Sequence, residues 1–342
     1  PKRTLSDDVA AIAWACQRYL ESGVTSTTDA WVEPGMPEAY IAADKSGALS
    51  IDTNLFFLAQ PDTWRSYSKD FVSFRSEIEA LPSSSHLTAK TIKFICDGAL
   101  SAGTAALLEP YLDDPQSTGL LIWDEDELID AMVHFDALGF QIHAHAIGDA
   151  AIRQALNAIE VVTRVNPRWD RRPVIAHAQL IHPDDLPRFA SLGVIANIQP
   201  LWTYLDPMNA QLIEPRIGSK RNNQQYQLAS LQRSGARIGY GSDWPVTSHL
   251  PLDALAVPTH RQSPLNANDQ RAFLSPHWVP NSRSDSSANN AAANGGKASN
   301  TKIDVRRTFQ EKIDIRNIVI PGARIVKIVV MKLTPPRIVP IP

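Results

Sequence analysis

Apolar residues along the chain follow two alternating patterns. Short stretches rich in β-branched and aromatic residues predict strands, as in FQIHAH at 140–145, where apolar and polar positions alternate. Between them, apolar positions recur every three to four residues and predict amphipathic helices. The predicted strands cover residues 24–30, 51–60, 90–98, 140–145, 172–180, 193–200 and 236–246. The predicted helices cover residues 6–22, 37–49, 149–164, 183–192 and 225–234, with another beginning at Asp124. Ser6, Asp124 and Asp149 are the expected caps of three of these helices.

The order of these elements predicts the fold class. Strands that alternate with helices form a parallel sheet, either doubly wound or closed into a barrel. Polar residues collect at the C-terminal ends of nearly all the predicted strands, which favours the barrel. A (β/α)8 barrel needs one strand more than the seven that the pattern supplies. We therefore predict an α/β fold, an incomplete (β/α)8 TIM-barrel type. No GxGxxG or GxxxxGK[ST] follows a strand, so a nucleotide-binding fold is disfavoured.

Three segments are predicted to lack regular structure within the barrel region. Residues 61–88 are predicted to be irregular or weakly helical, and 98–119 and 201–225 to be loops. Loops of this length commonly shape a functional pocket. We expect all three to line the substrate site, with Trp202 and Tyr204 among the lining side chains.

Composition divides the chain into three parts. Residues 1–265 form the predicted barrel, and residues 266–301, which include NSRSDSSANNAAANGG, form a low-complexity linker expected to be disordered. Residues 302–342 form a basic tail rich in Ile, Val and Pro, with nine Lys/Arg and three Asp/Glu. The whole chain has a formal net charge of −3, which suggests no nucleic-acid partner.

Cysteine usage and hydropathy predict a location. The two cysteines, Cys16 and Cys96, form no CxxC pattern and fit a reducing compartment. No apolar run is long enough to cross a membrane, and the first residues lack the apolar core of a signal peptide. We expect a cytoplasmic enzyme that does not contact membranes.

Four polar residues lie at the ends of successive predicted strands: Lys93, His145, His177 and Asp243. Imidazole and carboxylate ligands can hold a divalent metal while leaving a position for water. A lysine beside a metal makes sense when CO₂ converts it to a carbamate. Taken singly, each has a structural explanation: Lys93 could pair with Asp97 or Asp149, and Asp243 could be a turn residue. Their joint occurrence favours a metal-dependent hydrolase.

Four motifs add a resemblance to a known family. KFICDGALSAGTAALLEPY, HAHAIGDAAI, IAHAQL and GSDWPV resemble motifs of the amidohydrolase superfamily, in particular amidohydrolase family 3, whose members include YtcJ-like proteins and N-substituted formamide deformylases. The resemblance covers roughly residues 5–265. It implies that Lys93 is a carbamylated metal ligand, that His145 and His177 are catalytic metal ligands, and that Asp243 is a metal ligand and proton shuttle. It also implies substrate-side or supporting roles for His143, Asp97, Gly98, Gln179, Arg221 and Tyr226.

The chain also departs from this family. No histidine precedes His86, so the His-x-His pair that holds the more buried metal in family members is absent. The resemblance therefore implies a chain truncated at both ends, without the first strand and the flanking β-sandwich. We expect at most one metal site and an open seam between the strands at 24–30 and 236–246. Exposed strand edges favour pairing with other chains, so a homo-oligomer is one expected state.

Two functional hypotheses follow. In the first, the protein hydrolyses non-peptide carbon–nitrogen bonds of small amides or N-substituted formamides, using a water activated by a divalent metal. Zinc is the expected ion, although iron, manganese and nickel use similar ligands. In the second, the chain is a catalytically inactive barrel remnant, because the His-x-His pair is missing.

Overall fold

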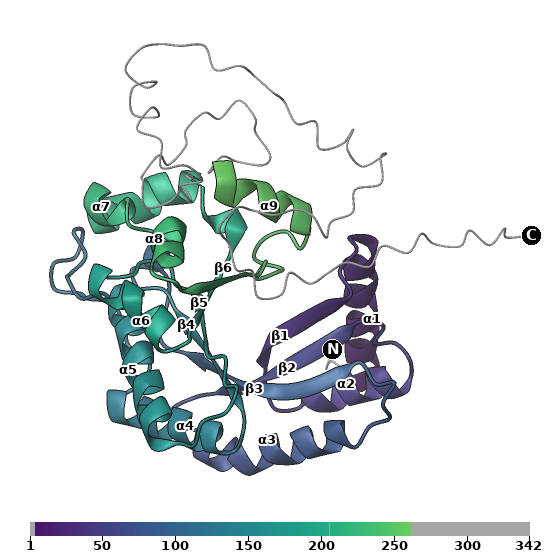
Figure 1. The fold of residues 1–342 in the computed structure, drawn as a ribbon. Coiled ribbons are helices and arrows are strands. Elements are labelled where there is room, and N and C mark those ends of the chain that lie inside the picture. The colour runs from purple at the N-terminus through teal and green to yellow at the C-terminus, as the bar shows by residue number, and fades with distance from the viewer. Residues whose placement is uncertain (1–3, 205, 261–342) are drawn as a thin grey trace, which may run out of the picture.

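The computed structural model describes residues 4–204 and 206–260. Seven strands form one parallel sheet in chain order. These are β1 (Ser26–Val32), β2 (Asp52–Ala59), β3 (Leu87–Ile95), β4 (Gln141–Ala146), β5 (Val174–His177), β6 (Ile195–Ile198) and β7 (Arg237–Tyr240). The sheet curls into a half-barrel, with helices along its outer side (Figure 1). The predicted α/β fold of the barrel type is confirmed.

The helices follow the predicted alternation in most places. They are α1 (Leu5–Glu21), α2 (Met36–Lys45), α3 (Trp64–Glu79), α4 (Glu125–Ala137), α5 (Asp149–Val165), α6 (Leu186–Ser191), α7 (Glu214–Asn222), α8 (Leu228–Arg233) and α9 (Pro251–His260). Short 3₁₀ turns occur at η1 (Leu100–Ala102), η2 (Pro183–Asp185) and η3 (Pro200–Trp202), and a π-helical turn at η4 (Asn209–Ile213).

Local side-chain contacts explain where several helices begin. Thr4 and Asp7 form a capping box at the start of α1, so the helix begins before Ser6, the predicted cap. Asp124 caps α4 as predicted, since its side chain accepts from the backbone N–H groups of the first turn. Asp149 was predicted to cap α5 but is its first helical residue, and its carboxylate accepts from Leu108 N at 2.9 Å.

Residues 61–88, predicted to be irregular or weakly helical, hold more regular structure than expected. Trp64–Glu79 forms helix α3 of 16 residues. Ser and aromatic residues have modest helix propensity, so the local signal was weak. Phe71 stacks on Phe57 of β2 at 5.1 Å between ring centroids, and both side chains are buried. Packing against the sheet therefore stabilises a helix that its own residues favour only weakly.

The prediction of a continuous loop over 201–225 was wrong. This segment contains the π-helical turn η4 and helix α7, as well as part of η3. The predicted strands at 172–180 and 236–246 are shorter than expected, because pairing stops at His177 and Tyr240. By contrast, residues 98–119 contain one 3₁₀ turn and are otherwise irregular, as predicted.

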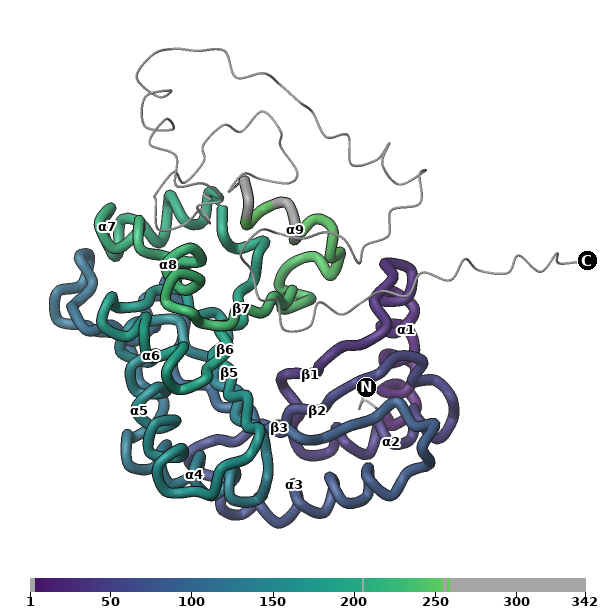
Figure 2. Tube along the Cα trace, viewed as in Figure 1, coloured from purple at the N-terminus to yellow at the C-terminus, as the bar shows by residue number. Residues whose placement is uncertain are grey.

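The sheet ends at β1 on one side and β7 on the other, as the predicted seam requires (Figure 2). Aromatic side chains connect α1 to the segment after β7. The Trp14 and Trp244 rings stack at 6.0 Å, and Tyr19 meets Trp244 edge-on at 5.4 Å. These contacts, rather than strand pairing, connect the parts of the chain next to the two edge strands, β1 and β7.

The other predictions concern the C-terminal segments and membrane-spanning helices. The predicted linker at 266–301 and the basic tail at 302–342 lie outside the described residues. Over the part that the structure describes, no helix is long and apolar enough to cross a membrane.

Candidate functional site

Three of the predicted site residues share one face of the sheet. Lys93 of β3 pairs with His143 of β4, and His145 lies two residues further toward the C-terminal end of β4. Side chains two residues apart on a strand point to the same side. Phe56 of β2 lies on this side too, because its ring centroid is 4.9 Å from that of His143. Since Phe57 packs against α3 on the opposite side, these residues face the inside of the half-barrel.

His177 reaches the same place through an unusual backbone conformation. It pairs with Ala146, whereas Ala176 pairs with His145, so simple alternation would turn His177 away from His145. Its φ of 71° is left-handed and redirects the chain where β5 ends. The His145 and His177 rings meet edge to face at 4.5 Å between centroids. The structure therefore brings together the two predicted histidine ligands.

Lys93 is a buried amine in contact with an imidazole. Its Nζ lies 3.2 Å from His143 Nδ1, and 5 % of the residue is exposed. Burial lowers the pKa of Lys93 to about 8, and the negative charge of Asp243 partly opposes this effect. Burial, with the nearby Lys93 cation, also holds the pKa of His143 well below its ordinary value. A neutral imidazole therefore faces an amine that loses its proton easily.

Asp243 lies at the open edge of the site. It follows β7 in a left-handed conformation with φ 52°, and it is exposed. Thr247 Oγ1 donates to Ser242 O at 2.5 Å, and Val246 N donates to Asp243 O at 2.9 Å. This turn places the carboxylate close enough to influence the charge of Lys93. Asp243 is thus both a turn residue and an electrostatic neighbour of the site.

Asp97 organises the backbone around the site. Its buried carboxylate accepts from the N–H groups of Ala106 at 3.0 Å, Ile147 at 3.0 Å and Gly148 at 2.8 Å. Its Oδ1 also lies 3.3 Å from His145 Nε2, which is 3.2 Å from Gly98 O. Because both neighbours are acceptors, His145 Nε2 donates, and Nδ1 keeps the lone pair when the ring is neutral.

This arrangement also bears on the structural explanation of Lys93. Asp97 bonds to backbone groups, and Asp149 accepts from Leu108 N. Within residues 4–204 and 206–260, neither carboxylate forms an ion pair with Lys93. The partner of Lys93 is instead His143.

Three other predicted residues, Gln179, Arg221 and Tyr226, bond to neighbouring loops. Gln179 Nε2 donates to Gln225 Oε1 at 2.6 Å, and Gln179 O accepts from Tyr226 N at 2.7 Å. Arg221 donates to the carbonyl oxygens of Glu109 and Pro110, both at 2.9 Å. These contacts tie the 98–119 loop and the segment after β5 to the segment before α8.

Sequence reasoning missed Gln199. Its Oε1 lies 2.7 Å from His177 Nδ1, and both side chains are buried. Trp202 stacks on the His177 ring at 5.1 Å and 8° between planes. The available signal was the position of Gln199 at the C-terminal end of a predicted strand, where the other candidate residues lie.

Two imidazoles in this site could hold a divalent metal ion. Burial holds the pKa of His177 well below its ordinary value, so the ring is neutral and able to coordinate. The contact between the His145 and His177 rings places a second imidazole beside it. Among the described residues, no three His, Cys, Asp or Glu side chains converge on one point. Besides the two imidazoles, the predicted ligands are Lys93 in its carbamate form and Asp243.

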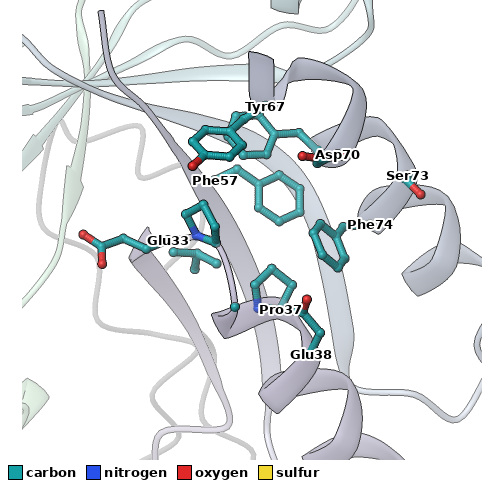
Figure 3. Close-up of a pocket in the computed structure, with 12 residues that line it drawn as sticks. Glu33, Pro37, Glu38, Phe57, Tyr67, Asp70, Ser73 and Phe74 are labelled. Carbon is teal, nitrogen blue, oxygen red and sulfur yellow. The ribbon is translucent and has the colours of Figure 1, made fainter. Parts of the chain in front are cut away.

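A cleft elsewhere has different chemistry. It has a volume of about 310 Å³ and lies between α2 and α3, lined by Pro37, Phe57, Tyr67 and Phe74, among others (Figure 3). Phe57 points to the helix side of the sheet, opposite to Phe56 and the histidines. The cleft is therefore separate from the candidate metal site.

Comparison with known proteins identifies the family of this chain. The profile described as "Amidohydrolase family" matches residues 1–258. The chain is 32% identical over 239 residues to "Protein LONG AFTER FAR-RED 3" of Arabidopsis thaliana, covering 70% of this chain and 39% of that protein. It is 31% identical over 172 residues to "Putative amidohydrolase YtcJ" of Bacillus subtilis (strain 168), covering 50% and 31%. It is 23% identical over 252 residues to "N-substituted formamide deformylase" of Arthrobacter pascens, covering 72% and 44%.

A solved structure supports the fold. The crystal structure of an uncharacterized metal-dependent hydrolase from Pyrococcus furiosus superposes with a TM-score of 0.66 at 24% identity. The match covers 81% of this chain and 53% of that one. The chain thus spans less than half the length of these curated relatives and about half of this structural neighbour.

Proposed function

This chain belongs to the amidohydrolase family, and on that premise we propose that it is a metal-dependent hydrolase of non-peptide carbon–nitrogen bonds. The proposed substrates are small amides, including N-substituted formamides. The name of the Arthrobacter pascens relative supports this substrate class. Zinc is the proposed ion, because two imidazoles and a carbamate match its usual nitrogen and oxygen ligands.

One observation carries the proposal. The His145 and His177 rings lie 4.5 Å apart at the C-terminal ends of neighbouring strands, on the side of the sheet that holds Lys93. In barrels of parallel strands, this end carries the chemistry. Two imidazoles in contact beside a buried amine are poorly explained as a packed core, because buried polar groups are costly.

Each residue has a distinct role in the proposed reaction. His145 and His177 would hold the metal, with Lys93 as the third ligand. A bound divalent ion supplies a water of lowered pKa and polarises the substrate carbonyl. The exposed carboxylate of Asp243 would accept a proton and deliver it to the leaving amine nitrogen. Phe56 and Trp202 would shield the reacting atoms from bulk water.

Lys93 must be converted to its carbamate for this role. The neutral amine nitrogen forms a bond to the carbon of CO₂ and releases one proton to solvent, leaving a carbamate anion. Only the deprotonated amine can react. A pKa of about 8 makes roughly a tenth of the amine available at pH 7, against less than a thousandth at the ordinary value.

A second candidate function is an inactive remnant of the barrel. One observation favours it: the described residues hold no converging group of three His, Cys, Asp or Glu ligands. In this case His145 and His177 would be a residual pair without turnover.

Turnover of a substrate panel separates the two candidates. The full chain, loaded with zinc and supplied with bicarbonate, is incubated with N-substituted formamides, linear amides and cyclic amides, and amine release is measured. The proposal expects release that depends on zinc and disappears in His177→Ala. Gln227→Met, a buried change next to Ile181 rather than the histidines, serves as the matched control. Equal release by wild type and His177→Ala, or none from any substrate, supports the inactive remnant.

A further inference from the structure

The turn that follows β6 is built to present two side chains to His177. Pro200 opens the 3₁₀ turn η3, and its carbonyl accepts from Thr203 Oγ1 at 2.7 Å. Gln199 O accepts from Trp202 N at 3.0 Å. Gln199 and Trp202 therefore stand at the two ends of one short, internally bonded turn.

The hydrogen bond from this turn identifies the protonated nitrogen of His177. Gln199 Nε2 points toward Asn197 O at 3.5 Å, which leaves Oε1 facing His177 Nδ1 at 2.7 Å. An amide oxygen only accepts, so Nδ1 carries the hydrogen. In a neutral imidazole the lone pair is then on Nε2.

Two other rings also restrain the His177 ring. Trp202 stacks almost parallel to it, with 8° between planes, and His145 contacts it at 69° between planes. A ring flip would exchange Nδ1 for a carbon and lose the bond to Gln199. Such a flip would also have to disturb a buried stack, because His177 and Gln199 are 5 % and 3 % exposed.

From this geometry we infer that Gln199 and Trp202 are positioning residues, which hold His177 in the Nδ1–H tautomer with its Nε2 lone pair available to a divalent metal. The metal part of this inference rests on the proposed function. Partners of this kind orient metal-binding histidines, and their loss commonly weakens metal affinity about 10- to 100-fold.

The experiment has two independent readouts on the full chain. Long-range ¹H–¹⁵N spectra of metal-free protein labelled with ¹⁵N-histidine report the tautomer of His177, and competition with a chelating dye reports zinc affinity. The variants are Gln199→Met, which removes the acceptor at similar volume, and Gln199→Glu, which restores an acceptor. Gln227→Met removes a different buried amide, one that donates to Ile181 O, and serves as the control.

The inference expects wild type to show the Nδ1–H tautomer alone. Gln199→Met should show both tautomers and bind zinc about 10- to 100-fold more weakly, while Gln199→Glu should recover both properties and Gln227→Met should retain them. Trp202→Phe should keep the tautomer and Trp202→Ala should lose it. An unchanged tautomer in Gln199→Met, or loss of the tautomer in Gln199→Glu as well, overturns the inference. If wild type binds no zinc, the proposed function fails, and the tautomer in metal-free protein still decides the role of Gln199.

Discussion

Asp97 offers a direct test of how the site is held together. In Asp97→Ala, the N–H groups of Ala106, Ile147 and Gly148 lose their common buried acceptor. Hydrogen bonds to a charged group contribute about 1.5 to 3 kcal/mol each, and some of this loss is recovered by water or relaxation. We therefore expect a loss of about 5 kcal/mol in the free energy of unfolding. A typical domain has about 5 to 15 kcal/mol in total.

The assay is urea denaturation followed by tryptophan fluorescence and far-UV circular dichroism. Asp114→Ala, an exposed change in the same loop, serves as the control and should stay within about 0.5 kcal/mol of wild type. Asp97→Asn keeps one acceptor oxygen and should fall between the two. A cost below about 1 kcal/mol for Asp97→Ala would refute the structural role. It would favour the substrate-side role that the sequence resemblance implies.

Three other predictions follow from burial and aromatic contacts. Because burial lowers the pKa of Lys93 to about 8, the unfolded chain binds more protons than the folded chain between pH 8 and 10.5. In metal-free, CO₂-free buffer, Lys93→Met should therefore be more stable than wild type by about 3 kcal/mol at pH 7, and this gain should shrink as the pH rises to 10.5. A difference in stability that does not depend on pH contradicts this prediction. Burial also holds the pKa values of His143 and His177 well below the ordinary histidine value, so the unfolded chain binds more protons than the folded chain below pH 6.5. The urea midpoint of unfolding should therefore decline from pH 7.5 to pH 5. A midpoint that stays constant over this range excludes two buried neutral histidines. Trp14→Ala should lower the free energy of unfolding by about 1 kcal/mol and increase hydrogen exchange around Asp243, because the Trp14–Trp244 stack connects α1 to that segment. Unchanged exchange would show that α1 does not stabilise the segment around Asp243.

Local sequence patterns predicted the sheet and half of the site. The alternation in FQIHAH placed His143 and His145 on one side of a strand, and pairing with Lys93 follows from parallel order. The same rule fails for His177. Its neighbour Ala176 pairs with His145, and only the left-handed backbone at His177 brings its ring to the site. A single unusual dihedral angle leaves no clear trace in hydrophobic periodicity.

Long-range backbone contacts account for the other differences. Asp97 and Arg221 were predicted in substrate-side or supporting roles, and their side chains bond mainly to backbone groups of loops. No residue type signals such a role, because any acceptor or donor of suitable reach can fill it. Helix α3 was predicted only weakly for a related reason, since packing of Phe71 on the sheet stabilises it more than its own propensity does.

In the proposed function, His145 and His177 hold one divalent metal. The most direct test is the metal content of the full chain, purified without added metal and again after zinc supplementation, by elemental mass spectrometry. A His145→Ala/His177→Ala double variant is measured in parallel, with Gln227→Met as the folded control. The proposal predicts about one zinc ion per chain in wild type and the control, and none in the double variant. Absence of metal from wild type after supplementation, or equal metal in the double variant, would contradict it.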